Sequence, residues 1–139
     1  MGEIRATVHL ENKEDRTLYK KGIIKKEEVR QMELDALVDT GAVMILLPQD
    51  IVEKLGLEIF DKTVVTLANE EKIELDLAGD FVLTVCGRTM VSDCLVGPPL
   101  CEPLIGQLVL ERLDLVLNPL KKTITPHPES PYLPHLKMK

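Results

Sequence analysis

The feature that most constrains the fold is a strict alternation of apolar and polar residues in two segments near the N-terminus. Apolar side chains recur at every second position in residues 4–10 and again in residues 32–38. A period of two places the apolar side chains on one face of a β-strand and the polar ones on the other. Strand-like patterns with turn residues between them follow in 64–77, 81–86 and 89–96. The sequence therefore predicts an all-β fold built largely from antiparallel strands.

Short helices and irregular segments are expected between and after these strands. Residues 48–56 have a proline at the start, a glycine past the end and apolar residues between, and residues 107–112 have a short helical pattern. Residues 13–28 are rich in Lys and Glu and are expected to form a solvated loop. Residues 126–139 hold four of the nine prolines and predict an extended tail, which places the folded domain at 1–125.

Length and composition exclude several classes of protein. A chain of 139 residues that is 45% hydrophobic and 29% charged is typical of one globular domain rather than of a disordered segment. The net charge of −6 and the 3% aromatic content argue against a nucleic-acid partner. Charges interrupt every apolar run before it reaches the about 20 residues that cross a bilayer, so no membrane partner is expected.

The cysteines and the N-terminal residues bear on the cellular compartment. The chain has an odd number of cysteines, Cys86, Cys94 and Cys101, and they form no Cys-x-x-Cys pair. This pattern is typical of proteins in a reducing environment. The first five residues lack the charged-then-apolar layout of a secretion signal. Both observations predict a cytoplasmic protein. No metal or other cofactor is expected, because His127 and His135 lie in the proline-rich tail at no ligand spacing.

An acidic turn follows the second alternating segment. Asp39-Thr40-Gly41 comes directly after Leu37 and Val38 and directly before the apolar run 42–47, whereas ordinary surface turns have polar neighbours. One interpretation is an Asx turn in an unrelated β domain, in which Asp39 caps backbone amides and Gly41 supplies a positive φ. The other interpretation is a catalytic carboxylate.

Two motifs in the chain resemble those of retropepsins, the retroviral-type aspartic proteases. The segment Ala36-Leu37-Val38-Asp39-Thr40-Gly41-Ala42 is followed far along the chain by Leu104-Ile105-Gly106, and the pair is similar to the retropepsin pair. The resemblance covers residues 32–124 and implies a closed antiparallel β-barrel-like acid-protease fold, with one or two short helices, that works as a homodimer. Further segments that look like members of the family are 48–57, 85–87, 95–99 and 118–124.

The resemblance also implies a role for each matching residue. Asp39 would be the general acid and base, Thr40 would fasten the two turns of the dimer together, and Gly41 would leave its carbonyl close to the substrate. Residues 64–77 would form a flap over the substrate. The second motif, Leu104, Ile105 and Gly106, would support the acidic turn, and the substrate-contacting residues would be Ala42, Ala68, Asn69, Pro98, Pro99 and Leu100.

The implied function is that of an aspartic endopeptidase. This chemistry needs two carboxylates, one acting as base on a water and one as acid toward the peptide carbonyl. Because the chain has one Asp-Thr-Gly, the second carboxylate would be Asp39 of another copy, and the expected partners are that copy and a polypeptide substrate. The alternative is a catalytically weak or inactive retropepsin-fold module that dimerises or binds peptides, since residues 68–70 at the flap tip include no glycine.

Overall fold

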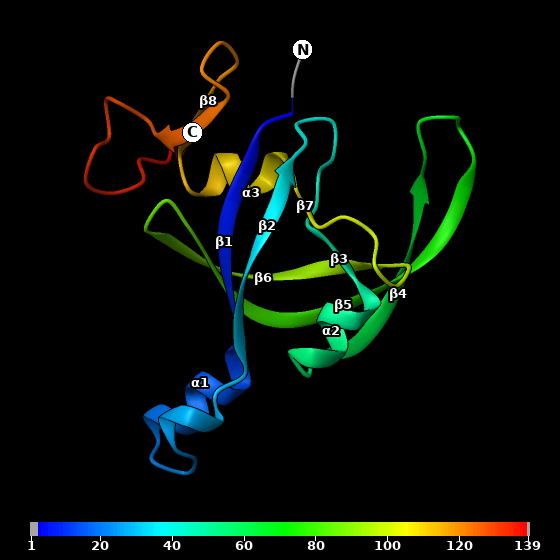
Figure 1. Ribbon diagram of the computed structural model, residues 1–139, viewed down its shortest axis with the longest axis vertical. Coiled ribbons are helices and arrows are strands. Elements are labelled where there is room, and N and C mark those ends of the chain that lie inside the picture. Colours follow the sequence, from blue (N-terminus) through cyan, green and yellow to red (C-terminus); the bar gives the residue numbers. More distant parts are fainter. Residues whose placement is uncertain (1–2, 139) are drawn as a thin grey trace.

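The computed structural model of the protein describes residues 3–138, and strands are its main elements. One sheet has the strand order β1-β2-β7-β3-β6-β5-β4, with an additional pairing of β1 with β5 (Figure 1). A separate hairpin is formed by β8 (Leu115–Asn118) and β9 (Thr123–Pro126). The strands of the large sheet are β1 (Arg5–Asn12), β2 (Gln31–Val38), β3 (Leu46–Pro48), β4 (Glu58–Thr66), β5 (Lys72–Val85), β6 (Arg88–Gly97) and β7 (Leu104–Ile105).

The mostly β class is confirmed, but the expected closed antiparallel barrel is wrong. The sheet is mixed, because β2 pairs with β7 and β3 pairs with β6 in parallel. It is not a closed barrel: within the described residues β4 lies at the edge with β5 as its one neighbour, and β3 meets β7 at one residue pair. The parallel pairings involve β3 and β7, which are too short for alternation to indicate strands.

The alternation of the first strand is confirmed. Ala6, Val8 and Leu10 are buried in the core, and β1 runs antiparallel to β2. The expected break between the hairpin ending at residue 77 and the strand starting at 81 is absent, because β5 continues from residue 72 to 85 with a shift in register between Gly79 and Phe81. The strand that forms one side of the predicted flap is therefore also a core strand.

The two expected helices are confirmed as α2 (Gln49–Lys54) and α3 (Gln107–Arg112). Gly56 follows α2 at φ +64°, as its position after the helix predicts. The amide of Leu57 donates to the carbonyl of Val52 at 3.0 Å, which closes the helix end. The last turn of α2 is therefore a Schellman motif.

The expectation of a loop at residues 13–28 is wrong. This segment contains α1 (Lys13–Lys20) and a short 3₁₀ helix, so that residues 3–138 hold more helices than expected. Asn12 begins α1, because its side chain accepts a hydrogen bond from the amide of Asp15 at 2.9 Å. The buried Asp15 also accepts hydrogen bonds from the Arg30 guanidinium at 2.8 and 3.0 Å, which hold the pKa of Asp15 below its usual range. A cap and an ion pair, rather than an apolar stripe, stabilise this helix.

The chain after β9 turns back onto the domain and is held by two residues. Arg88, which is 6% exposed, donates to the carbonyls of Leu113 at 2.9 Å and Asp114 at 3.1 Å, and to the carbonyl of Ser130. The Asp114 carboxylate accepts a hydrogen bond from the amide of His135 at 3.0 Å. Hydrogen bonds from Ser130 and His135 hold the pKa of Asp114 below its usual range. Much of the proline-rich segment is thus anchored at the base of the β8–β9 hairpin.

All three cysteines are free thiols, and they differ in exposure. Cys86 is exposed and Cys101 is half-buried. Cys94 lies in the core, and its burial raises the pKa of its thiol to about 12. As for membrane segments, none of the helices found between residues 3 and 138 combines the length and apolar character that a bilayer crossing requires.

Candidate active site

The acidic turn lies where β2 ends against β7. Leu37 is opposite Leu104 and Val38 is opposite Ile105 in the parallel pairing of these strands. The amide of Asp39 donates a hydrogen bond to the carbonyl of Ile105 at 3.0 Å. The two motifs, far apart in the sequence, are therefore adjacent in the fold.

The carboxylate of Asp39 is oriented by its own turn. One of its oxygens, Oδ1, accepts a hydrogen bond from the amide of Gly41 at 2.9 Å, and the carbonyl of Asp39 accepts one from the amide of Ala42 at 3.1 Å. Within residues 3–138 the other oxygen, Oδ2, accepts no hydrogen bond. Asp39 is half-buried, whereas Thr40 and Gly41 are exposed. An Asx turn is present, and it leaves Oδ2 free to act on another molecule.

The Asx-turn interpretation expected a positive φ at Gly41, and this expectation is wrong. Gly41 does not adopt a positive φ. A Cβ at this position would instead lie 3.2 Å from Oδ1 of Asp39, which is closer than most real Cβ contacts. Gly41 therefore serves the close approach of the carboxylate to the turn rather than an unusual backbone conformation.

The second motif also supports the residues that follow the acidic turn. The amides of Gln107 and Leu108, at the start of α3, donate to the carbonyls of Ala42 at 2.8 Å and Val43 at 3.2 Å. Amides in the first turn of a helix have no partner within the helix, so these bonds satisfy them. A Cβ at Gly106 would lie 2.4 Å from the carbonyl oxygen of Ala42. Position 106 therefore has no space for a side chain while the turn keeps its position.

A pocket of about 400 Å³ lies beside the carboxylate. Four of its residues lie outside both motifs and were not predicted as neighbours of Asp39: Glu3 and Ile4 precede β1, and Leu117 and Pro119 belong to the β8–β9 hairpin, whose position in space no local pattern indicates. The one signal available was the resemblance of residues 118–124 to the retropepsin family, which includes Pro119 but did not assign it to the site. The pocket is lined by Glu3, Ile4, Leu37, Val38, Asp39, Thr40, Leu117 and Pro119.

The hairpin that was predicted to act as a flap is present, and its tip is exposed. Strands β4 and β5 make a hairpin around residues 67–71, and in Figure 1 this hairpin (green) rises toward the same end of the molecule as the loop after β2 (cyan). Ala68 and Asn69 lie at the tip, where the Asn69 side chain accepts a hydrogen bond from the amide of Glu71 at 3.0 Å. Glu70 takes a positive φ of 67°, a conformation that glycine adopts without strain. Neither Ala68 nor Asn69 lines the pocket beside Asp39.

The predicted substrate loop at 98–100 is exposed and lies outside the same pocket. The amide of Leu100 donates to Oδ1 of Asp50, in the first turn of α2, at 2.9 Å. Leu100 is 86% exposed and has a positive φ of 65°. Asp50 thus holds the shape of this loop, a role that the sequence did not predict.

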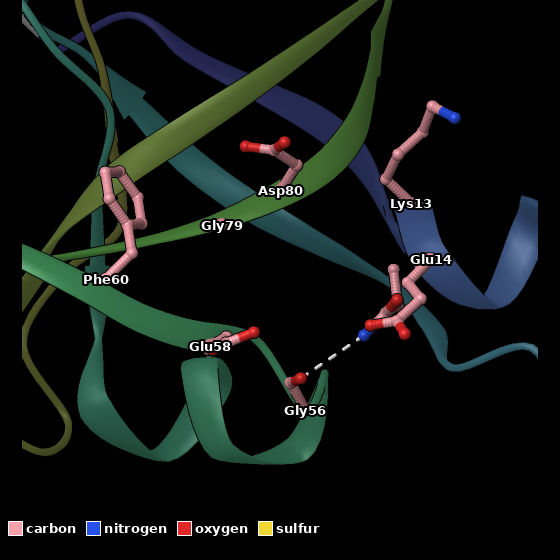
Figure 2. A pocket seen from close by; sticks show the side chains of 8 residues that line it. Lys13, Glu14, Gly56, Glu58, Phe60, Gly79 and Asp80 are labelled. Carbon is pink, nitrogen blue, oxygen red and sulfur yellow. Dashed lines mark hydrogen bonds between the residues drawn. The ribbon is translucent and has the colours of Figure 1, made fainter.

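A larger pocket of about 480 Å³ lies near the start of α1 (Figure 2) and shares no lining residue with the pocket beside Asp39. It combines the ammonium of Lys13 with the carboxylates of Glu14, Glu58 and Asp80 beside the exposed ring of Phe60. In the part of the chain that is described, no group of three or more His, Cys, Asp or Glu residues could hold a metal ion. None of the predicted site residues lines this pocket, so size alone does not identify the site.

Comparison with known proteins identifies no family. No family model matches the sequence, and a search of curated proteins finds no match. A functional interpretation therefore depends on the residues of the site and on their contacts.

Proposed function

We propose that the protein is a retropepsin-like aspartic endopeptidase that acts as a homodimer. The observation that carries the proposal is the contact between the two motifs, in which the amide of Asp39 donates to the carbonyl of Ile105 at 3.0 Å and the carbonyl of Ala42 accepts from Gln107 at 2.8 Å. An Asx turn in an unrelated β domain has no need of a second apolar-apolar-Gly motif beneath it. This contact therefore favours a turn that must hold its carboxylate in one place.

The proposed reaction is hydrolysis of a peptide bond between two Asp39 carboxylates, one from each chain. The ionised carboxylate takes a proton from water as the water oxygen attacks the carbonyl carbon, and the protonated carboxyl donates its proton to the carbonyl oxygen. Collapse of the tetrahedral intermediate returns a proton to the leaving nitrogen and breaks the C–N bond. The free Oδ2 of Asp39 is the oxygen available for these transfers.

The proposed substrate is a polypeptide bound in extended form. An extended chain is recognised by main-chain hydrogen bonds along its length and by pockets for alternate side chains. The β4–β5 hairpin would cover the substrate through Ala68 and Asn69, and Ala42 with the 98–100 loop would form side-chain subsites. Thr40 is exposed next to the carboxylate, where a second copy could reach its hydroxyl.

The test is digestion of a peptide library by wild type and by Asp39→Asn over acid to neutral pH, with the products identified by mass spectrometry. We expect wild type to cleave and Asp39→Asn to lose cleavage while keeping its circular dichroism spectrum. Asp61→Asn makes the same chemical change at an exposed position of β4 and serves as the matched control.

Two outcomes would overturn parts of the proposal. Equal cleavage by wild type and Asp39→Asn would remove Asp39 from the reaction. A wild type that binds library peptides, dimerises and cleaves nothing at any pH would make the protein the non-catalytic peptide-binding module described above.

A further inference from the structure

We infer that a basic pocket beside α1 binds an acidic, partly apolar segment of the polypeptide substrate, far from the bond that is cleaved. Its role as an anchor for substrate rests on the proposed function, whereas the binding of the segment does not. The pocket, named the α1 pocket, has a volume of about 400 Å³ and is lined by Glu11, Lys13, Arg16, Lys20, Val82 and Val91.

The wall that α1 contributes to the pocket is basic. Lys13, Arg16 and Lys20 are three and four positions apart, so they lie on one face of the helix. The lining holds a single carboxylate, that of Glu11, and Arg16 already pairs with it. The two lysines therefore leave an excess of positive charge in a chain whose net charge is −6. Such a wall attracts an acidic ligand.

The guanidinium of Arg16 is held in one orientation. Its Nε donates to Oε1 of Glu11 at 2.6 Å and its Nη2 donates to Oε2 at 2.5 Å. Glu11 is 6% exposed, and the guanidinium lies 5.4 Å from the centroid of the Tyr19 ring. Within residues 3–138 the Nη1 of Arg16 donates no hydrogen bond. An oriented donor therefore remains for a ligand, and its ordering costs little entropy on binding.

The floor of the α1 pocket is apolar. Glu11 lies opposite Val82, and Val82 lies opposite Val91, so these side chains form a row across β1, β5 and β6. The row is on the outer face of the sheet, because the neighbouring Phe81 is buried in the core on the other face. Val91 is 52% exposed, and an apolar side chain of a ligand would cover it. None of the six lining residues is aromatic, which favours a peptide over a nucleic acid with bases to stack.

The α1 pocket and the acidic turn lie at opposite ends of the β1–β2 pair. Glu11 is opposite Gln31 at the start of β2, and Asp39 follows the end of β2. Figure 1 shows α1 (blue) at the end of the molecule away from the loop after β2 (cyan). A strand of this length spans about 25 Å. An extended substrate has a similar rise per residue, so the acidic segment should lie about eight residues or more from the cleaved bond.

Binding is measured by fluorescence anisotropy with a short labelled peptide of alternating Glu and Leu, at low ionic strength. The protein carries Asp39→Asn, so that cleavage does not consume the probe. Peptides with Gln in place of Glu, or Ser in place of Leu, separate the contributions of charge and of apolar contact. Lys20→Gln perturbs the wall and Val91→Thr perturbs the floor. Lys21→Gln is the matched control, because it makes the same change at the next exposed residue, outside the pocket.

We expect the Glu and Leu peptide to bind more tightly than either altered peptide, and its affinity to fall as salt is added. Lys20→Gln should raise the dissociation constant by about fivefold, and Val91→Thr should raise it by about threefold. Lys21→Gln should have a smaller effect than Lys20→Gln. Equal effects of the two lysine variants would show that net charge, rather than the pocket, attracts the peptide. Tighter binding of a labelled oligothymidylate than of the peptide would overturn the assignment to an acidic peptide.

A kinetic measurement separates this inference from the proposed function. A peptide that wild type cleaves is extended by the Glu and Leu segment, placed about eight residues from the cleaved bond. The extension should lower KM for wild type, and Lys20→Gln should lose most of this gain. If wild type cleaves the peptide and the extension changes nothing, the α1 pocket is not an anchor and the proposed function stands. If the peptide binds in a manner that depends on Lys20 but wild type cleaves nothing, the proposed function fails and the pocket is a peptide-binding site without a substrate role.

Discussion

Replacing Gly106 by alanine tests the support of the acidic turn directly. Gly106 has φ −111° and ψ −168°, an extended conformation that any residue adopts, so the substitution adds no backbone strain. Its only effect is the space that a methyl group occupies. That methyl carbon would lie 2.4 Å from the carbonyl oxygen of Ala42 and 2.8 Å from that of Val43.

The size of the effect follows from what must move. Overpacking a filled site costs about 1–3 kcal/mol of the free energy of unfolding. Here the neighbours are backbone carbonyls, and moving them away also weakens the hydrogen bonds from Gln107 and Leu108, each worth about 1 kcal/mol. We therefore expect a loss of about 3 kcal/mol or more, which lowers the melting temperature of a domain of this size by about 12 °C.

Urea denaturation followed by circular dichroism, at matched protein concentration, measures this loss. Hydrogen exchange should show faster exchange of the Asp39 and Gln107 amides, which lie on either side of the contact. Gly22→Ala is the control, because Gly22 has φ +76° with no atom within 4 Å, and alanine there should cost about 1 kcal/mol through the backbone alone. A Gly106→Ala protein that unfolds within about 0.5 kcal/mol of wild type would refute the argument that position 106 supports the turn.

Three further predictions concern stability away from this contact. Glu70→Gly should raise the free energy of unfolding by about 1 kcal/mol, measured by thermal unfolding, because Glu70 adopts a positive φ that glycine takes without strain. A less stable variant would show that the Glu70 side chain makes a contact that outweighs the strain. Arg88→Met should free the segment around Ser130 from its anchor, so limited proteolysis should cut there sooner than in wild type; unchanged cutting would contradict the anchoring role. Asp15→Asn should lower the free energy of unfolding by about 2 kcal/mol near neutral pH, measured by urea denaturation. Because Arg30 lowers the pKa of Asp15, the stabilisation is present above the ordinary aspartate pKa, and the difference from wild type should shrink as the pH falls below about 4. A difference that does not depend on pH would refute the role of this ion pair.

Local pattern predicts much of this fold where neighbours in sequence are neighbours in space. The alternation in β1, the helix ended by Gly56 and the β4–β5 hairpin each follow from residues within a few positions of one another. The helix at Lys13–Lys20 was missed although Asn12 is a favourable N-cap, because its buried contact comes from Arg30, beyond the segment itself. The charge-rich composition led to the prediction of a solvated loop, whereas the Asn12 cap and the Asp15–Arg30 ion pair stabilise a helix.

The candidate site, too, was predicted only in part. The two motifs indicated a supported acidic turn, and the contacts of Asp39 with Ile105 and of Ala42 with Gln107 are what such support requires. Glu3 and Leu117 could not be predicted as neighbours of Asp39, because their position depends on how β1 and the β8–β9 hairpin meet the end of β2. Long-range packing of this kind has no periodic signal in the sequence.

The order of synthesis gives the contact between the motifs a further consequence. The chain leaves the ribosome from its N-terminus, so Asp39 emerges long before Ile105 and Gln107, which hold its turn in place. Pairings between distant segments also form late, because the loop between them must first be closed. We therefore expect the acidic turn to be among the last parts of the domain to acquire its final shape. A nascent or truncated chain that ends before the second motif would therefore carry the aspartate without the backbone contacts that hold its turn in place.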